Sequence, residues 1–305
     1  MVAVLIYIFY TDIWEDIFPL LLSIKDDIHI DIALCSDNDN SKIINDLKQL
    51  NIINIRYVEN RGGDIGPFLL QIQDLDEDKY PYFIKIHSKK SIIAKFDWKY
   101  ILFNSLIGSK EILEKNTSLL HNNKNIGAIT DPTLIMTNIG KNKLYIDILA
   151  KLLNISTTKK RFMAGSMFMS RTELFKKYFT KNFIDAIYPL LETGKVSDSY
   201  NATYCHSLER IFGQIVSNEN LQIGHIQQKP YITIYNKLTQ STFSLYKCYN
   251  NYCYTKSKKA FIFGYLYPVI NDDESIVINW TYMKQYDNYF KRYDKQTNGL
   301  YIGVS

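Results

Sequence analysis

The sequence predicts an α/β fold in which a mainly parallel β-sheet is flanked by helices. Short apolar runs recur through the first 130 residues, and stretches in which apolar residues follow helical spacing lie between them. Alternation of strands and helices is typical of parallel sheets that are covered by helices on both faces. With 305 residues, of which 46% are hydrophobic, the chain is long enough to bury a substantial core.

The predicted elements follow this alternation in order. Apolar runs expected to form strands cover residues 2–10, 29–36, 54–60, 82–88 and 126–130. Helical spacing fills the first gaps, in residues 14–22 and 43–50. After residue 130 the alternation weakens. Residues 161–175 predict a strand and then a helix that begins near Thr172, and residues 204–216 predict a helix with one apolar stripe.

A change in composition near residue 230 predicts a chain in two parts. Residues 230–305 are rich in Tyr, Lys and Asn, and the βα alternation does not extend into them. We therefore expect an α/β domain over residues 1–229 and a C-terminal extension or subdomain over residues 230–305.

Charge and cysteine content exclude several functional classes. The formal net charge of +5 is too mild to indicate nucleic-acid binding, but it is compatible with an anionic small molecule or a membrane surface. The four cysteines lack the density and spacing of a disulfide scaffold or a zinc site, which favours a reducing cytosol. No run reaches the roughly 18 uncharged apolar residues of a membrane-spanning helix. We expect a cytoplasmic protein, or one that is peripheral to the inner face of a membrane.

Polar residues follow four of the predicted strands at the point where each strand ends. Because parallel strands end at one edge of a sheet, and because ligands bind open α/β sheets at that edge, these residues predict a nucleotide-type site. Solvated loops are the alternative interpretation. The residues concerned are Tyr10, Thr11 and Asp12, then Ser36 and Asp37, then Asn60 to Asp64, and finally His87, Ser88, Lys89 and Lys90.

A glycine turn leads into a predicted helix after the third strand. Gly62 and Gly63 allow positive φ and a close approach of the backbone to a ligand, and a helix N-terminus favours an anion. Asp64 is expected to cap the helix, and Arg61 favours binding of phosphate or sugar. A tight turn without a ligand is the alternative. No G-x-G-x-x-G fingerprint comes directly after the first strand, and this disfavours a nicotinamide-dependent oxidoreductase.

His206, Glu209 and Arg210 share one side of the predicted helix 204–216, because residues three and four apart are neighbours on a helix surface. A carboxylate beside a histidine and an arginine is typical of a general base. An ordinary set of surface salt bridges is the alternative.

Five stretches of the chain, in this order and at this spacing, resemble the rhamnan synthesis F family of bacterial polysaccharide glycosyltransferases. They are IFYTDIWEDI, VENRGGDIGPFL, FIKIHSKKS, FMAGSMFMSR and CHSLERIFG, and the resemblance spans roughly residues 4–225. It implies a GT-A type fold, in which a nucleoside diphosphate lies over the C-terminal ends of the first strands. It also implies an inverting hexosyltransferase of polysaccharide or capsule biosynthesis.

The resemblance implies roles for individual residues at the donor. Asp37 matches the acidic residue that contacts the base or the ribose, and Gly165 and Ser166 match the segment that lines the donor sugar. Arg171 is expected to anchor that segment or a phosphate. Glu209 matches the carboxylate that takes a proton from the acceptor hydroxyl. His206 and Arg210 are expected to orient it or to contact the phosphates.

One segment departs from the pattern of such enzymes. Where they carry Asp-x-Asp and a divalent cation, this sequence has His87, Ser88 and Lys89. We expect these cationic side chains to neutralise the leaving diphosphate directly. The alternative is that His87 serves as a single metal ligand, with Mn²⁺ or Mg²⁺ as a cofactor.

The resemblance suggests dTDP-β-L-rhamnose as donor, with a UDP-sugar as an alternative, and a glycan or lipid-linked glycan as acceptor. Three roles are open for the Tyr- and Lys-rich residues 246–267: stacking against an acceptor, contact with an anionic membrane, or an ordinary cap over the core. The absence of Asp-x-Asp also leaves open a catalytically silent module that binds nucleotide-sugars or glycans.

Overall fold

The computed structural model describes residues 1–90, 98–137, 140–157, 161–194 and 201–225, together with the backbones of six strands between residues 232 and 291. The chain divides into two compact units. The first comprises residues 1–92 and 102–226, and the second comprises residues 93–101 and 227–305. The helices of the described part all fall short of the length or the hydropathy that a membrane crossing requires.

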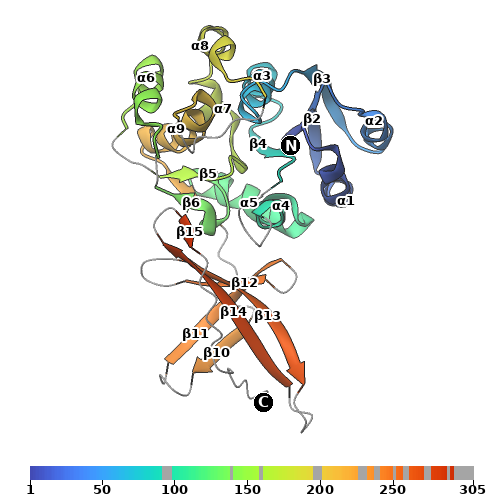
Figure 1. Cartoon of the computed structure of the whole chain (residues 1–305). Helices are drawn as coiled ribbons and strands as arrows, with labels where there is room; N and C mark the ends of the chain where they lie inside the picture. The colour runs from blue at the N-terminus through green and yellow to red at the C-terminus, as the bar shows by residue number, and fades with distance from the viewer. Residues whose placement is uncertain are drawn as a thin grey trace. The chain divides into compact units, whose positions relative to one another are not determined.

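The first unit is built on a seven-stranded sheet with the order β3-β2-β1-β4-β8-β5-β9 (Figure 1). Strands β1 to β4 are parallel, β8 is antiparallel to both of its neighbours, and β5 is parallel to β9. This confirms the predicted mainly parallel sheet and all five predicted strands. The strands are β1 Val2–Ile8, β2 Ile28–Cys35, β3 Ile52–Val58, β4 Tyr82–His87, β5 Ile126–Ile129, β8 Phe168–Arg171 and β9 Gln222–Gly224.

The strand order changes direction between β1 and β4. From β1 the chain runs outward through β2 to β3, and it then returns to β4 on the other side of β1. The register pairs Tyr7 with His87, so the two strands end side by side. In open α/β sheets a crevice forms at the carboxyl ends of the strands where the order reverses. The topology therefore predicts a ligand site beside His87.

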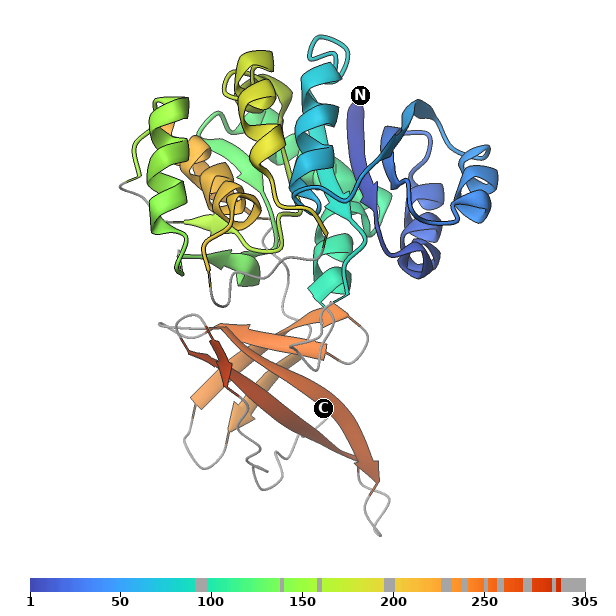
Figure 2. The ribbon, with the colours of Figure 1, turned by 45° about the horizontal axis from the view of Figure 1, so that its top comes forward.

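Helices cover both faces of this sheet (Figures 1 and 2). Five of them, α3, α6, α7, α8 and α9, contribute buried residues to one hydrophobic core with the sheet, while α4 and α5 lie on the other face. The helices are α1 Trp14–Ser23, α2 Ser41–Leu47, α3 Ile65–Asp74, α4 Trp98–Ile107, α5 Lys110–Asn122, α6 Lys143–Leu153, α7 Thr172–Lys176, α8 Lys181–Ile187 and α9 Tyr204–Asn218. Short 3-10 helices are η1 Thr11–Ile13, η2 Pro132–Leu134 and η3 Tyr188–Leu190, and β6 Ile135–Met136 pairs with β7 Phe162–Met163.

Aromatic packing fixes α3 and α9 against the sheet. The ring of Phe68 on α3 lies 5.6 Å from that of Phe83 on β4 and 5.4 Å from that of Phe212 on α9. The predicted apolar stripe of α9 is confirmed, since its members are fully buried. Gly213 lets α9 come close to β7, because a Cβ there would lie 2.1 Å from the carbonyl oxygen of Arg161. This close approach sets the position of the α9 side chains over the site.

The second unit contains a six-stranded antiparallel sheet in which each strand pairs with the next along the chain. Its strands are β10 Ile232–Asn236, β11 Ser241–Tyr249, β12 Tyr252–Lys256, β13 Phe261–Ile270, β14 Ile276–Tyr286 and β15 Tyr289–Lys291. The side chains of residues 246–267, for which acceptor stacking, membrane contact or a capping role was predicted, lie outside the described ones.

Candidate functional site

Hydrogen bonds tie the ends of β1, β2 and β4 together. The hydroxyl oxygen of Ser88 accepts hydrogen bonds of 2.8 Å from the backbone N–H groups of both Phe9 and Tyr10. The amide of Asn38, just after β2, donates to the carbonyl of Phe9 at 2.6 Å. The polar ends of β1, β2 and β4 therefore meet at one edge of the sheet.

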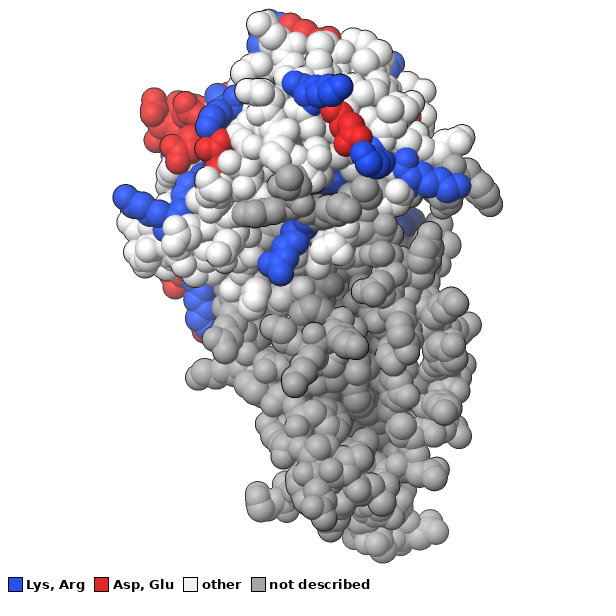
Figure 3. Space-filling model, turned by 90° about the vertical axis from the view of Figure 1, so that its left-hand side faces the viewer, with Lys and Arg blue, Asp and Glu red and all other residues white. Residues whose placement is uncertain are grey.

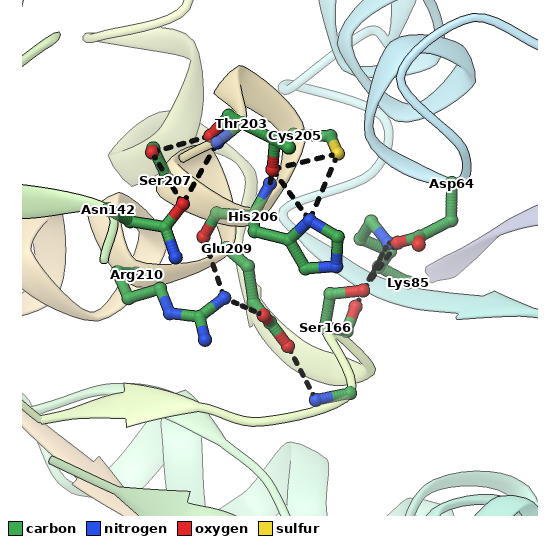
Figure 4. A network of polar contacts seen from close by, with 11 residues as sticks. Asp64, Lys85, Asn142, Ser166, Thr203, Cys205, His206, Ser207, Glu209 and Arg210 are labelled. Atoms are coloured by element: carbon green, nitrogen blue, oxygen red, sulfur yellow. Dashed lines mark hydrogen bonds and ion pairs between the residues drawn. The ribbon is translucent and has the colours of Figure 1, made fainter. Parts of the chain in front are cut away.

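A buried charged cluster lies beside this edge, formed by Asp64, Lys85 and Ser166 (Figure 4). The ammonium of Lys85 donates to Asp64 Oδ2 at 2.5 Å and to the carbonyl of Ser166 at 3.0 Å. The hydroxyl of Ser166 donates to the same Asp64 oxygen. Asp64 lies between β3 and α3, Lys85 lies on β4, and Ser166 lies between β7 and β8. The cluster therefore joins three segments that are far apart in the sequence.

Burial and charge compensate each other in this cluster. Burial opposes ionisation of Asp64, but the charge that His87 carries when it is protonated, the Lys85 ammonium and the Ser166 hydroxyl together hold the pKa of that carboxyl well below its usual range. Burial lowers the pKa of Lys85, and the neighbouring Asp64 carboxylate counteracts this. Asp64 is therefore ionised at neutral pH, and the Lys85 ammonium is its main counter-charge.

His87 is held neutral beside the cluster. Burial lowers the pKa of its imidazole to about 3, and Asp64 opposes that shift only in part. The Nδ1 atom lies 3.5 Å from Asp64 Oδ2 and has no hydrogen-bond partner among the described residues. Buried polar atoms are nearly always hydrogen-bonded in proteins, so an unpartnered nitrogen at a sheet edge is a candidate contact for a ligand.

The neutrality of His87 predicts a pH dependence of stability. Below pH 6.5 the unfolded chain protonates this histidine whereas the folded protein does not, so the free energy of unfolding falls as pH decreases from 6.5 towards 3. The loss attributable to His87 approaches about 1.4 kcal/mol per pH unit. Urea denaturation between pH 7 and 4.5 should show that His87→Gln flattens this dependence. Parallel curves for the variant and the wild type would contradict a buried neutral histidine.

Glu209 supports the turn that carries Ser166. Its Oε1 accepts the backbone N–H of Gly165 at 2.7 Å, and its Oε2 accepts from Arg210 at 2.6 Å. Gly165 and Ser166 both have positive φ, of 83° and 51°, which is a strained conformation for the serine. The Glu209 carboxylate holds the turn at Gly165, and Asp64 and Lys85 hold it at Ser166.

The N-terminus of α9 is capped by side chains. Thr203 accepts the backbone N–H of His206, and its hydroxyl oxygen lies 2.6 Å from His206 Nδ1. The carboxylate of Glu192 accepts the backbone N–H groups of Tyr204 at 2.5 Å and Cys205 at 3.1 Å. These contacts satisfy free donors at the helix start. They also fix His206, whose imidazole points towards the charged cluster in Figure 4.

The glycine turn has the predicted positive φ, at 64° for Gly62 and 56° for Gly63. A Cβ at Gly62 would lie 2.8 Å from a methyl carbon of Leu191, so this glycine is also required by packing. The guanidinium of Arg61 donates to the carboxylate of Glu59 and to the carbonyls of Pro189 and Leu191. In this structure Arg61 holds the segment before α9.

The other predicted donor-binding residues lie around the rim of the site. Lys90 forms a 2.7 Å ion pair with Asp12 and lies 5.1 Å above the ring of Tyr10. Lys89 is half-buried, and Asp37 is exposed at the end of β2. Tyr10, Lys89 and Lys90 are thus grouped at the ends of β1 and β4, one strand away from Asp37.

Two local predictions are wrong. Asp64 occupies the N-cap position of α3 but makes no capping hydrogen bond, because its carboxylate turns to Lys85 and Ser166 instead. Arg171 has no access to a phosphate at this edge, because it pairs with Tyr82 at the opposite end of β4. Its guanidinium donates to carbonyls at the end of α5 and the start of β5, so in this structure it holds the α5–β5 connection and not the Gly165–Ser166 segment.

Sequence reasoning missed two residues that shape the site, Lys85 and Glu192. Lys85 lies in an apolar strand, and a lysine in the centre of such a run is itself a signal, since charged residues are rarely buried without a partner. The sequence places Ser88 at the strand end but gives no sign of its hydrogen bonds to Phe9 and Tyr10. Glu192 had no local signal, because its role depends on the fold bringing it to α9.

The described side chains do not form a divalent cation site. No group of three His, Cys, Asp or Glu residues converges in the described part of the chain. Among the described residues, the carboxylate next to His87 is that of Asp64, and a lysine ammonium and a serine hydroxyl already occupy its Oδ2. Mg²⁺ and Mn²⁺ prefer several oxygen ligands. Among the described residues, Asp64 is therefore the carboxylate that could accompany His87 in the predicted alternative of a metal on that histidine, and its Oδ2 is already engaged.

Comparison with known families relates this geometry to other proteins. Residues 1–221 match the family described as rhamnan synthesis protein F. The chain belongs to this family. The match covers every strand of the first unit's seven-stranded sheet except β9, and it confirms the resemblance seen in the sequence motifs.

Individual relatives of this rhamnan synthesis family chain are distant. Two strains of Xanthomonas campestris pv. campestris have an uncharacterized protein named WxcX that is 24% identical to it, over 76% of this chain and 33% of WxcX. The chain thus spans about a third of the length of these curated relatives. The crystal structure of S. aureus TarS 1–349 matches with 12% identity and a TM-score of 0.40, over 74% of this chain and 59% of that one.

Proposed function

We propose that the chain is a glycosyltransferase that uses a nucleoside-diphosphate sugar. The observation that carries this proposal is the convergence, at the point where the strand order reverses, of a cationic strand end with a carboxylate on α9. Membership of the rhamnan synthesis protein F family supports it.

The donor diphosphate lies at the ends of β1 and β4 in this proposal. Lys89 and Lys90 supply positive charge, and the glycine turn before α3 lets the phosphates approach backbone N–H groups. The neutral imidazole of His87 adds a hydrogen bond through the nitrogen that has no hydrogen-bond partner among the described residues. Asp37 contacts the base or the ribose, and the Gly165–Ser166 turn lines the sugar. Support comes from the shared location of these groups at one edge.

Glu209 is the proposed general base of an inverting transfer. It takes the proton from an acceptor hydroxyl as that oxygen attacks the anomeric carbon, and the diphosphate leaves from the opposite face. Two hydrogen bonds, from Gly165 and Arg210, orient the carboxylate. A carboxylate has about four acceptor positions, so both bonds are compatible with a third to the acceptor. His206 and Arg210 assist by orienting this carboxylate.

For the substrates, we propose dTDP-β-L-rhamnose as donor, with a UDP-sugar as the alternative. The acceptor is a glycan or a lipid-linked glycan in polysaccharide or capsule biosynthesis. Family membership is the support for both assignments. The described residues themselves carry no group that distinguishes rhamnose from another hexose.

The test is release of nucleoside diphosphate from a panel of dTDP-, UDP- and GDP-sugars, with either EDTA or Mn²⁺ present. We expect selective release from one donor that persists in EDTA, because lysines neutralise the leaving group. Activity that EDTA removes and Mn²⁺ restores would overturn the metal-independent mechanism. Absence of both release and binding, the latter by calorimetry, would overturn the nucleotide-sugar proposal itself.

A second candidate is a catalytically silent module that binds nucleotide-sugars or glycans. The observation that favours it is the use of both Glu209 oxygens in contacts that support the Gly165–Ser166 turn. Donor binding without turnover across a panel of rhamnan, teichoic-acid and lipid-linked acceptors supports the silent module. Turnover with any of them excludes it.

A further inference from the structure

Helix α6 exposes an apolar stripe to solvent. Leu144 is 65% exposed, Ile148 36% and Leu152 58%, and these three account for much of the exposed large hydrophobic surface among the described residues. Their spacing of four residues places them on one side of the helix. The opposite side is buried against α9 through Ile146, Leu149 and Leu153. The helix therefore has two apolar sides, and only one of them packs on the protein.

Lysines flank the exposed stripe. Lys143 and Lys151 are exposed on α6, and Lys141 is exposed two residues before it. Asp147 is the one acidic residue among them, and it forms an ion pair of 2.5 Å with Lys143. Three lysines against one aspartate give this surface a net charge of +2. Figure 3 faces the side on which α6 lies in Figure 1, and it shows lysine and arginine side chains, together with some aspartate and glutamate side chains, scattered over a mainly uncharged surface.

We propose that this exposed side of α6 docks on an anionic membrane surface. Helices that lie in a membrane interface combine an apolar stripe with adjacent lysines, which interact with anionic headgroups while the apolar side chains enter the acyl boundary. A second protein copy would bring like charges together, whereas an anionic bilayer complements both the leucines and the lysines.

The location of α6 gives this docking a direct link to the candidate site. Asn142, which precedes the helix, accepts the backbone N–H of Thr203 at 3.1 Å, and the rings of Tyr145 and Tyr204 stack at 4.3 Å. Helix α6 is thus fixed to the start of α9, the helix that carries Glu209. If the proposed function holds, a docked α6 brings that carboxylate close to the membrane, where a lipid-linked acceptor resides. The membrane contact itself does not depend on that function.

Co-sedimentation of the full chain with vesicles tests the proposal. We expect binding to phosphatidylglycerol–phosphatidylcholine vesicles and little binding to phosphatidylcholine alone. Leu144→Ser with Leu152→Ser should weaken partitioning about tenfold or more, and Lys151→Gln should weaken it about fivefold. Circular dichroism confirms that each variant is folded, which is expected because all three positions are exposed.

Matched controls separate this surface from general adhesion. Leu190→Ser changes a leucine of η3 that is 54% exposed, and Lys181→Gln changes a lysine on α8 in an i,i+4 ion pair. Both controls should bind vesicles like the wild type. The proposal would be overturned if the controls lost as much vesicle binding as the α6 variants, or if the protein bound neutral vesicles equally well. It would also be overturned if light scattering showed a dimer that the double leucine variant dissociates. Because the assay has no sugar donor, its outcome is independent of glycosyltransferase activity.

Discussion

Glu209→Gln is expected to reduce kcat by about 10²- to 10⁴-fold, the range supplied by a general base. The affinity for the donor should stay close to that of the wild type. The reason is that glutamine retains an oxygen that can accept the backbone N–H of Gly165, so the Gly165–Ser166 turn keeps its support. Steady-state release of nucleoside diphosphate gives kcat, and calorimetry gives the dissociation constant of the donor.

Glu209→Ala separates the two roles of this carboxylate. Alanine removes both the base and the hydrogen bond to Gly165, so we expect it to lose donor affinity as well as turnover. A Glu209→Gln variant with wild-type kcat would eliminate Glu209 as the base and leave it a purely supporting role. Both variants also remove the carboxylate that pairs with Arg210. An equal loss of donor affinity in the two variants would therefore point to this Arg210 pair, and not to the hydrogen bond with Gly165, as the contact on which donor binding depends.

Lys85→Met is expected to lower the free energy of unfolding by about 3–5 kcal/mol, the cost of leaving a buried charge without its partner. Lys85 is 1% exposed, and its ammonium is the main counter-charge of Asp64. Methionine fills a similar volume beside Phe68, so the loss reflects charge more than packing. Urea denaturation, followed by circular dichroism, measures the change.

Two further variants check the cause of that loss. Adding Asp64→Asn to Lys85→Met removes the orphaned charge, so the double variant should recover part of the stability. Lys177→Met breaks an exposed ion pair with Glu219 and should change the unfolding midpoint little. If the double variant is as unstable as the sum of the two single variants, the Asp64–Lys85 pair is not the source of the effect.

The sheet was predictable because hydrophobic patterning decides it. The runs around β1, β2 and β4 are almost continuously apolar, as expected of parallel strands buried on both faces. The antiparallel insertion of β8 between β4 and β5 was not predictable in the same way. Its pairing is non-local, with Phe83 opposite Ser170, and no short-range signal in the sequence specifies a strand partner 87 positions away.

The candidate site was only partly predictable. Patterning placed His87 and the glycine turn at the correct edge, because the end of a strand can be recognised locally. The hydrogen bond from Gly165 to Glu209 and the cap of Glu192 on α9 join segments that are distant in sequence. Asp64 illustrates the difference: its local context indicates a helix cap, but a buried lysine on a neighbouring strand is the stronger partner.

The joining of distant segments at this site has a consequence for synthesis of the protein. Asp64 and Lys85 leave the ribosome early, whereas Ser166 and Glu209 follow much later, and domains complete their folding only when all core segments have emerged. Until β8 is made, β4 presents an unpaired hydrogen-bonding edge, since β8 is its neighbour on that side. A chain released before residue 168 therefore carries a bare strand edge next to an incomplete charged cluster. Such a fragment is a candidate for aggregation and clearance rather than for nucleotide binding.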